Sequence, residues 1–347
     1  MRAATLENYH KPLEIREVKI AEPGPNEVTL EVKACGLCLT DVHISDGKIP
    51  TVKLPLIPGH EIAGVIVKKG SEVKGFDIGE RVTVCVDVSC GKCEFCLRGE
   101  TNRCLNLIRI GFERNGGMAD YVNVPGANVE RISEEIPFEK AAIIPDAVAC
   151  MYRGLKTVGG VSASSKVAIL GIGGLGMQGI RIGKLLGAHI TCTSRNEKKL
   201  EMAESIGADV TINTGKDNFL ETSRRLVGSF DVVIDIIGNR NSILDAVAAC
   251  RSGGKVVVLG YVDPKLEIPS YDVVIREKQV LGSRAVTRSE FHEVVKLVNI
   301  GKLDPHIGEL IPIGHVNEAL ENLKKGKYLT RSVLMLPFDK CCGKKSI

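Results

Sequence analysis

The sequence predicts an α/β protein with two domains of different architecture, a β-rich antiparallel domain and a doubly wound α/β domain. Up to about residue 150, short runs alternate apolar and polar positions, as at Val28, Leu30 and Val32, and Pro–Gly turns separate these runs. From about residue 165, continuous apolar runs alternate with segments of helix length, which is typical of buried parallel strands joined by helices. A length of 347 residues also fits about two domains.

In chain order, the pattern changes near residues 150 and 286. We expect the first domain at 1–150, with a four-cysteine lobe at about 85–105, and the α/β domain at 151–286. The expected parallel strands are Val167–Leu170, Ile190–Thr193, Val210–Ile212, Val232–Ile234 and Val256–Leu259. Segment 287–347 offers one helix and one strand, which is too little for a domain, so we expect it to pack on the first domain. Its last residues, Lys340–Ile347, are expected to form a solvated tail.

Composition and charge exclude several classes of protein. The formal net charge of +4 is too slight to suggest a nucleic-acid binder. No apolar run reaches the roughly 18 residues of a membrane span, and the first residues do not resemble a secretory signal. We therefore expect a cytoplasmic protein, in a reducing compartment where its 12 cysteines favour metal binding over disulfides.

A glycine-rich loop follows the first strand expected in the α/β domain and precedes a helical stretch. Its pattern is G-x-G-x-x-G, which is typical of a dinucleotide-binding loop because glycines permit the tight turn and close approach to a pyrophosphate. The alternative is an ordinary tight turn between strand and helix. The candidate cofactor-binding residues are Gly171, Gly173, Gly174, Leu175 and Gly176.

The residues after the second strand bear on the choice of cofactor. A carboxylate at this position would bind the ribose 2′-hydroxyl of NAD, whereas arginine accommodates the 2′-phosphate of NADP. The strand ends at Ser194-Arg195 without a carboxylate, so the sequence favours NADP(H) over NAD(H). The alternative is that Arg195 is an ordinary surface residue and Ser194 only precedes the next helix.

Four of the cysteines fall within 15 residues, in the order C-x2-C-x2-C-x7-C. Four close thiolates suit a closed tetrahedral zinc site that leaves no position for substrate, which indicates a structural ion. An iron–sulfur cluster usually has a shorter last gap followed by proline, and two disulfides are the other alternative. The candidate ligands are Cys90, Cys93, Cys96 and Cys104.

Several short motifs follow one another along nearly the whole chain. They are Gly36-Leu-Cys38-Leu-Thr40-Asp41, Gly59-His60-Glu61, the four-cysteine lobe, Gly116-Gly117-Met-Ala-Asp-Tyr121 and the glycine loop. With these motifs the chain resembles the zinc-containing alcohol dehydrogenases of the medium-chain dehydrogenase/reductase family. The resemblance implies a GroES-like catalytic domain, a Rossmann cofactor domain and an active site in the cleft between them. It also implies a homodimer or homotetramer, with Gln279–Gly282 as the pairing segment.

The same resemblance implies a catalytic zinc as the second ion of the chain. Its first two ligands would be Cys38 and His60, and alignment on the flanking residues makes Asp146 the third. Cys150, one helical turn later, is the alternative third ligand. Glu61 matches an acidic residue close to the metal that is a ligand in some relatives.

Four further residues receive roles from the resemblance. Asp41 matches the carboxylate that orients the ligand histidine, Thr40 the hydroxyl that receives the substrate proton, and His43 the outer end of the proton relay. Arg331 matches an arginine that binds the cofactor pyrophosphate, and its alternative is a surface charge.

The function implied is hydride transfer between a small-molecule alcohol, aldehyde or ketone and a nicotinamide cofactor, with NADP(H) favoured and zinc as a Lewis acid. One alternative is a zinc-independent reductase of activated double bonds, such as an enoyl-CoA or quinone reductase of the same superfamily. Another is a non-catalytic protein that binds a dinucleotide or zinc.

Overall fold

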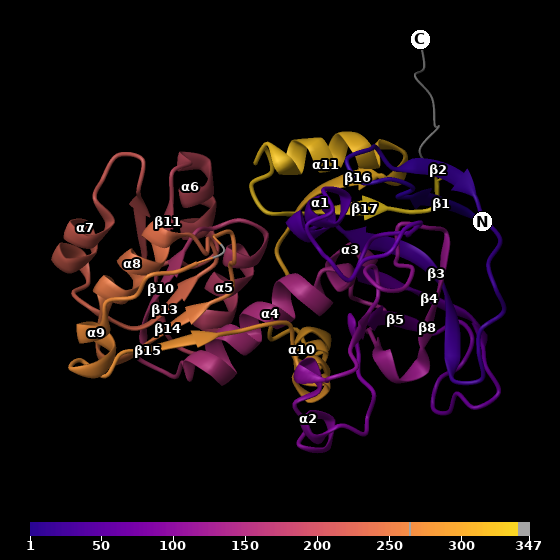
Figure 1. The fold of residues 1–347 in the computed structure, drawn as a ribbon, viewed down its shortest axis with the longest axis horizontal. Coiled ribbons are helices and arrows are strands. Elements are labelled where there is room, and N and C mark those ends of the chain that lie inside the picture. The colour runs from indigo at the N-terminus through magenta and orange to yellow at the C-terminus, as the bar shows by residue number, and fades with distance from the viewer. Residues whose placement is uncertain (264, 339–347) are drawn as a thin grey trace, which may run out of the picture. The chain divides into compact units, whose positions relative to one another are not determined.

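A computed structural model describes residues 1–263 and 265–338, which form two compact units (Figure 1). Of the described residues, the first unit holds Met1–Asp146, Val286–Gly301 and 305–338, and the second holds Ala147–Ala285 and Lys302–Asp304. No helix within the described ranges combines the length and the apolar character that a membrane crossing needs. The tail expected at Lys340–Ile347 lies outside the described residues.

The first unit is built on a seven-stranded sheet, as the alternating pattern predicts. The strand order is β16-β17-β3-β4-β5-β9, with β8 also paired to β3, and all pairs are antiparallel except β16 with β17. These strands are β3 (Glu27–Gly36), β4 (Glu61–Lys69), β5 (Arg81–Val84), β8 (Tyr121–Pro125), β9 (Val129–Arg131), β16 (Ile307–Pro312) and β17 (Arg331–Met335). Val28, Leu30 and Val32 of β3 are all buried in the core.

Two short ladders and five α-helices complete the first unit. The ladders pair β1 (Arg2–Thr5) with β2 (Glu14–Glu17) and β6 (Asp87–Val88) with β7 (Ile108–Arg109). The helices are α1 (Leu39–Ser45), α2 (Glu94–Leu97), α3 (Phe138–Ala142), α10 (Arg288–Asn299) and α11 (Val316–Lys324). The C-terminal segment holds more structure than the sequence predicts, since β16 and α11 accompany the expected helix and strand.

The second unit is a six-stranded parallel sheet with the order β12-β11-β10-β13-β14-β15. Its strands are β10 (Lys166–Leu170), β11 (His189–Ser194), β12 (Val210–Asn213), β13 (Phe230–Asp235), β14 (Cys250–Val258) and β15 (Gln279–Gly282). Its α-helices are α4 (Ala149–Tyr152), α5 (Gly174–Leu185), α6 (Glu197–Ser205), α7 (Phe219–Leu226), α8 (Arg240–Ala249) and α9 (Ser270–Val274). This order reverses between β10 and β13, where doubly wound sheets bind ligands. The predicted Rossmann architecture is confirmed.

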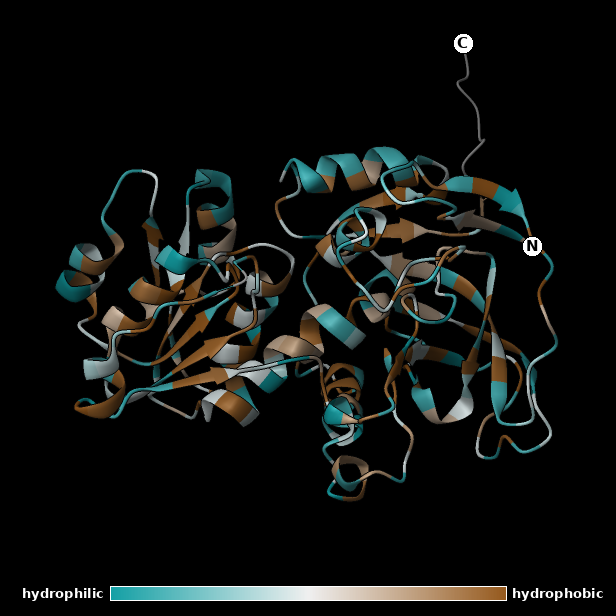
Figure 2. Cartoon of the chain, viewed as in Figure 1, coloured by the Kyte–Doolittle hydropathy of each residue, from teal (hydrophilic) through white to brown (hydrophobic). Residues whose placement is uncertain are grey.

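Hydropathy follows these layers. Figure 2 shows the central strands of the parallel sheet as hydrophobic, and most of the longer helices carry both colours. Residues of β10, β13 and β14 such as Ala168, Val233 and Val256 are fully buried. Continuous apolar strands under amphipathic helices are the packing that the sequence pattern predicts.

Candidate metal and cofactor sites

Cys38, His60 and Asp146 lie together in the first unit, with one ligand atom from each within 4.8 Å of the others. Asp146 Oδ2 is 3.6 Å from Cys38 Sγ and 3.7 Å from His60 Nε2. Tetrahedral zinc with ordinary bond lengths would separate such atoms by roughly 3.4–3.6 Å. The donor set and its spacing therefore fit a zinc ion with three protein ligands.

Local structure explains how these three side chains meet. Cys38 is the N-cap of α1, two residues after the end of β3, and His60 directly precedes β4, the antiparallel partner of β3. Asp146 lies in a π-helical turn, Ile144–Val148. Cys150 is buried but is not part of the ligand group, since the wider π-helical turn breaks the four-residue spacing that would put both on one face.

Asp41 connects two of these residues. Its Oδ2 accepts the backbone N–H of Cys38 at 2.9 Å, which caps α1, and its Oδ1 lies 3.4 Å from His60 Nδ1. The carboxylate is only 1% exposed. It is therefore placed to fix the orientation of the His60 ring, as carboxylates beside metal-bound imidazoles do.

Arg331 and Glu61 lie against the same group. The Arg331 guanidinium is buried and donates to Glu61 Oε1 at 2.7 Å and to Asp146 Oδ2 at 2.5 Å. The surface-charge alternative for Arg331 is therefore wrong, and the expected pyrophosphate role stays a prediction. Glu61 lies beside the candidate metal group and pairs with Arg331.

The charges of this cluster suit a divalent cation. Two carboxylates, Glu61 and Asp146, pair with the Arg331 guanidinium, and a third, Asp41, lies beside His60. Burial raises the pKa of Glu61 to about 7, against the opposing effect of Arg331. Burial lowers the pKa of His60, but nearby Asp41 and Asp146 outweigh it, so the net shift is well upward. The upward shift of the His60 pKa reflects the neighbouring carboxylates Asp41 and Asp146, whose negative charge a bound dication would neutralise.

Thr40 and His43 occupy α1 beside the ligand group. Thr40 Oγ1 lies 3.4 Å from Cys38 Sγ, and His43 is one helical turn further along. Burial and the charge of Lys48 lower the pKa of His43, against the opposing effect of Asp46. A neutral imidazole at this position can accept a proton.

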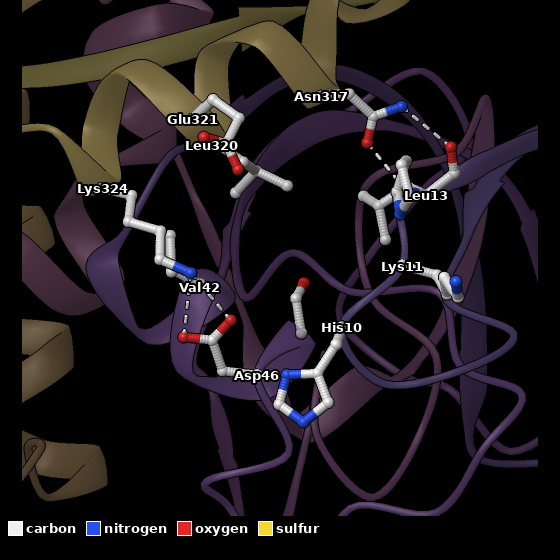
Figure 3. A pocket seen from close by; sticks show the side chains of 11 residues that line it. His10, Lys11, Leu13, Val42, Asp46, Asn317, Leu320, Glu321 and Lys324 are labelled. Atoms are coloured by element: carbon white, nitrogen blue, oxygen red, sulfur yellow. Dashed lines mark hydrogen bonds and ion pairs between the residues drawn. The ribbon is translucent and has the colours of Figure 1, made fainter.

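A pocket of about 290 Å³ lies against α1 and α11 (Figure 3). Lys324 of α11 pairs with Asp46, the C-cap of α1, and Asn317 exchanges two hydrogen bonds with the backbone of Leu13. None of the candidate metal ligands lines this pocket. Its walls fasten α1, and so fix the helix that presents Thr40 and His43.

The four cysteines of the lobe also lie together. Cys96 Sγ is 3.5 Å from Cys93 Sγ and 4.0 Å from Cys90 Sγ, and Cys104 Sγ accepts the Cys90 N–H at 3.2 Å. Zinc–thiolate bonds in a tetrahedron separate sulfurs by roughly 3.8 Å, whereas a disulfide needs about 2.0 Å. Backbone N–H groups of Lys92 and Cys93 lower the pKa of Cys90 to about 6, which favours the thiolate. The group fits a closed zinc site and excludes the disulfide alternative.

The glycine loop joins β10 to α5 in the second unit. Gly171 adopts φ +89°, a conformation that favours glycine, and a Cβ on Gly176 would lie 2.5 Å from the Gly171 carbonyl oxygen. A Cβ on Gly173 would meet nothing within 4 Å, so the loop is open there. Gly174 and Leu175 begin α5, whose first N–H groups suit a phosphate. The loop fits a dinucleotide pyrophosphate.

Ser194 and Arg195 stand at the carboxyl end of β11. Ser194 Oγ accepts the N–H of Asn196 at 3.1 Å, which leaves its hydroxyl proton free to donate. Arg195 is exposed, and no carboxylate of the described residues pairs with its guanidinium. Thr193 Oγ1 accepts the N–H of Gly171 at 3.2 Å, which ties this strand end to the glycine loop.

Sequence reasoning missed two sets of contacts at these sites. It did not anticipate the pairs of Arg331 with Glu61 and Asp146, because they depend on the pairing of β17 with β3, strands about 300 residues apart in sequence. It also overlooked Glu197, whose partners Asn213 and Lys216 come from the end of β12 and the turn that follows it. An arginine at the start of the last apolar strand was the available signal for the first set of contacts; nothing in the sequence signals the second.

The chain is similar in sequence to known dehydrogenases along nearly its whole length. A family model described as "Alcohol dehydrogenase GroES-like domain" matches residues 24–134, and one described as "Zinc-binding dehydrogenase" matches 174–299. An alcohol dehydrogenase of Geobacillus stearothermophilus is 34% identical over 98% of this chain and 100% of its own. An acryloyl-coenzyme A reductase of Sulfurisphaera tokodaii is 26% identical over 93% of this chain and 96% of its own.

Solved structures of dehydrogenases are similar to this chain in fold as well. An NAD-dependent alcohol dehydrogenase superposes with a TM-score of 0.91, at 31% identity, over 97% of this chain and 100% of that chain. A zinc-binding dehydrogenase from Sinorhizobium meliloti, solved with NADP, gives a TM-score of 0.89 at 30% identity, over 96% of this chain and 99% of that chain.

Proposed function

Because the chain belongs to the alcohol dehydrogenases of the medium-chain dehydrogenase/reductase family, we propose that it is a zinc-dependent alcohol dehydrogenase or carbonyl reductase that favours NADP(H). The proposed zinc dependence is supported by the group of Cys38, His60 and Asp146, which lies beside Thr40. A double-bond reductase that works without zinc has no need of this ligand group.

Each residue of the candidate metal site has a proposed role in the reaction. Cys38, His60 and Asp146 would hold a zinc ion, which supplies Lewis-acid polarisation of the substrate oxygen. Asp41 orients His60, and Thr40 accepts the proton of the substrate hydroxyl and passes it toward His43. In the direction of carbonyl reduction, the same two residues return a proton.

Cofactor binding is proposed for the second unit. The glycine loop and the N-terminus of α5 would hold the pyrophosphate of a nicotinamide dinucleotide, which supplies the hydride chemistry. Ser194 can donate a hydrogen bond, and Arg195 a charged pair, to a 2′-phosphate. Ser194→Asp with Arg195→Ala should therefore reduce the use of NADP relative to NAD by at least ~10-fold. An unchanged cofactor ratio would refute this role of the two residues.

We also propose that the protein is a homo-oligomer. β15 is the last strand of the parallel sheet, so within the described residues one of its edges is unpaired. Large apolar side chains are exposed on the segment before it, among them Tyr261, Tyr271, Val274 and Ile275. An open edge beside an apolar surface is a template for pairing with a second copy. Light scattering should give a mass of at least two chains of 37.4 kDa.

The central experiment combines activity with metal content. The purified protein should contain about two zinc ions per chain and reduce NADP in the presence of some primary, secondary or polyol alcohol. Removing one zinc with a chelator should abolish this activity, and adding zinc should restore it.

The second candidate is a double-bond reductase, favoured by the similarity to the acryloyl-coenzyme A reductase. A double-bond reductase should oxidise NADPH in the presence of acryloyl-coenzyme A and should not oxidise alcohols. This activity should survive loss of the metal held by Cys38, His60 and Asp146.

A further inference from the structure

The carboxylate of Glu197 lies close to the end of β11, and two side chains hydrogen-bond it. Glu197, the first residue of α6, receives hydrogen bonds on both oxygens. Asn213 Nδ2 donates to Oε2 at 2.5 Å and Lys216 Nζ donates to Oε1 at 2.5 Å. Lys216 thus both pairs with the negative charge and fixes its direction.

The partners of Glu197 lie against the candidate ribose-binding residues. Ser194 and Asn213 are register partners in β11 and β12, and the N–H of Thr214 donates to the Ser194 carbonyl at 3.0 Å. A Cβ on Gly215 would lie 3.6 Å from the Cβ of Arg195. The turn that carries Lys216 is therefore in contact with the residues proposed to meet the 2′ position.

The charge of Glu197 matters because of where it stands. A carboxylate just beyond the second strand binds the ribose 2′-hydroxyl of NAD and repels a 2′-phosphate. Glu197 is the first carboxylate after β11, three residues beyond Ser194. An unpaired Glu197 carboxylate would repel a 2′-phosphate and so oppose the preference for NADP(H) that Ser194 and Arg195 support.

We propose that Lys216 is a specificity-determining residue, which permits NADP(H) to bind by pairing with Glu197 and holding that carboxylate against the β12 turn. This inference rests on the proposal that the end of β11 receives the 2′ side of a nicotinamide dinucleotide. It assigns Lys216 an indirect role, through Glu197, and no contact with the phosphate.

The expected effect is moderate and depends on salt. The side chains of Lys216 and Glu197 are 69% and 52% exposed, so solvent screens their charges. We expect Lys216→Met to lower the ratio of NADP to NAD affinity by roughly three- to tenfold at low ionic strength. The change should shrink in 0.5 M salt, where the Debye length is only about 4 Å.

The experiment is a double-mutant cycle on the full-length protein. Dissociation constants for NADP+ and NAD+ are measured by titration calorimetry for the wild type, Lys216→Met, Glu197→Gln and the double variant. Lys184→Met is the matched control, because Lys184 pairs with Asp209 at 2.8 Å just before the opposite end of β12.

The proposal predicts that Lys216→Met lowers the affinity ratio, that Glu197→Gln raises it, and that Lys216→Met has little effect once Glu197 is Gln. The control should leave the ratio unchanged. An unchanged ratio in Lys216→Met overturns the proposal, and so does an equal loss with and without Glu197, since Lys216 would then act directly on the phosphate. The wild-type ratio separately tests the proposed NADP preference: a wild type that prefers NAD refutes that preference, while the cycle still decides the role of Lys216.

Discussion

Replacing Asp41 with asparagine should weaken metal binding at the Cys38–His60–Asp146 site and spare the four-cysteine site. The Asp41 carboxylate is buried, accepts the Cys38 N–H at 2.9 Å and lies 3.4 Å from His60 Nδ1. An asparagine side chain has the same shape and its oxygen can still accept from Cys38. It removes the negative charge that strengthens the imidazole as a ligand.

The magnitude follows from these contacts. Loss of the carboxylate beside a metal-bound histidine typically costs 10–100-fold in metal affinity, or about 1.4–2.7 kcal/mol. Asp41→Ala should lose as much metal affinity and, in addition, about 0.5–2 kcal/mol of folding free energy, because the cap of α1 disappears as well.

Chelator competition with a coloured zinc indicator gives the measurement. Zinc should leave the wild type in two phases, one for each site, and only the phase of the Cys38 site should become faster in Asp41→Asn. The four-cysteine phase is the control within the same molecule. Wild-type release rates for both phases in Asp41→Asn would refute the role of this carboxylate.

Three further outcomes are expected. Asp146→Ala should lower zinc content from about two ions per chain to about one, measured by atomic emission, while Cys150→Ala keeps both; the reverse result would contradict the assignment of Asp146. Cys93→Ser should lose the other zinc and lower the melting temperature, and wild-type values of both would contradict the structural site. Burial acts to raise the pKa of Glu113, but hydrogen bonds from Arg109 outweigh it and the pKa is lowered. The stabilisation by Glu113 is then present above about pH 4.5 and lost as pH falls through its lowered folded pKa. Glu113→Gln should cost about 1–2 kcal/mol in denaturant unfolding at pH 7 and progressively less toward pH 4, and a constant difference would contradict this.

Much of the fold was predictable because its signals are local. The continuous apolar strands of the second unit and the glycine loop are each encoded within about 20 residues, and the four cysteines within 15. The helix α11 was missed although Val316, Ala319, Leu320 and Leu323 recur at helical spacing, whereas its neighbour β16 is half exposed and gives no strong alternation.

The composition of the candidate metal group was predictable, but its charge balance was not. Cys38 and His60 stand in recognisable motifs, and flanking residues point to Asp146. The position of Arg331 depends on the register between β17 and β3, strands far apart in sequence, and the π-helical turn at Asp146 has no sequence signature. Tertiary contacts of this kind decide where a charged side chain is buried.

The two proposed zinc sites can be tested by anomalous diffraction from crystals of the purified protein at the zinc absorption edge. We expect two peaks per chain, one among Cys90, Cys93, Cys96 and Cys104, and one bonded to Cys38, His60 and Asp146. A single peak, confined to the four cysteines even after zinc is added, would contradict a zinc-dependent alcohol dehydrogenase.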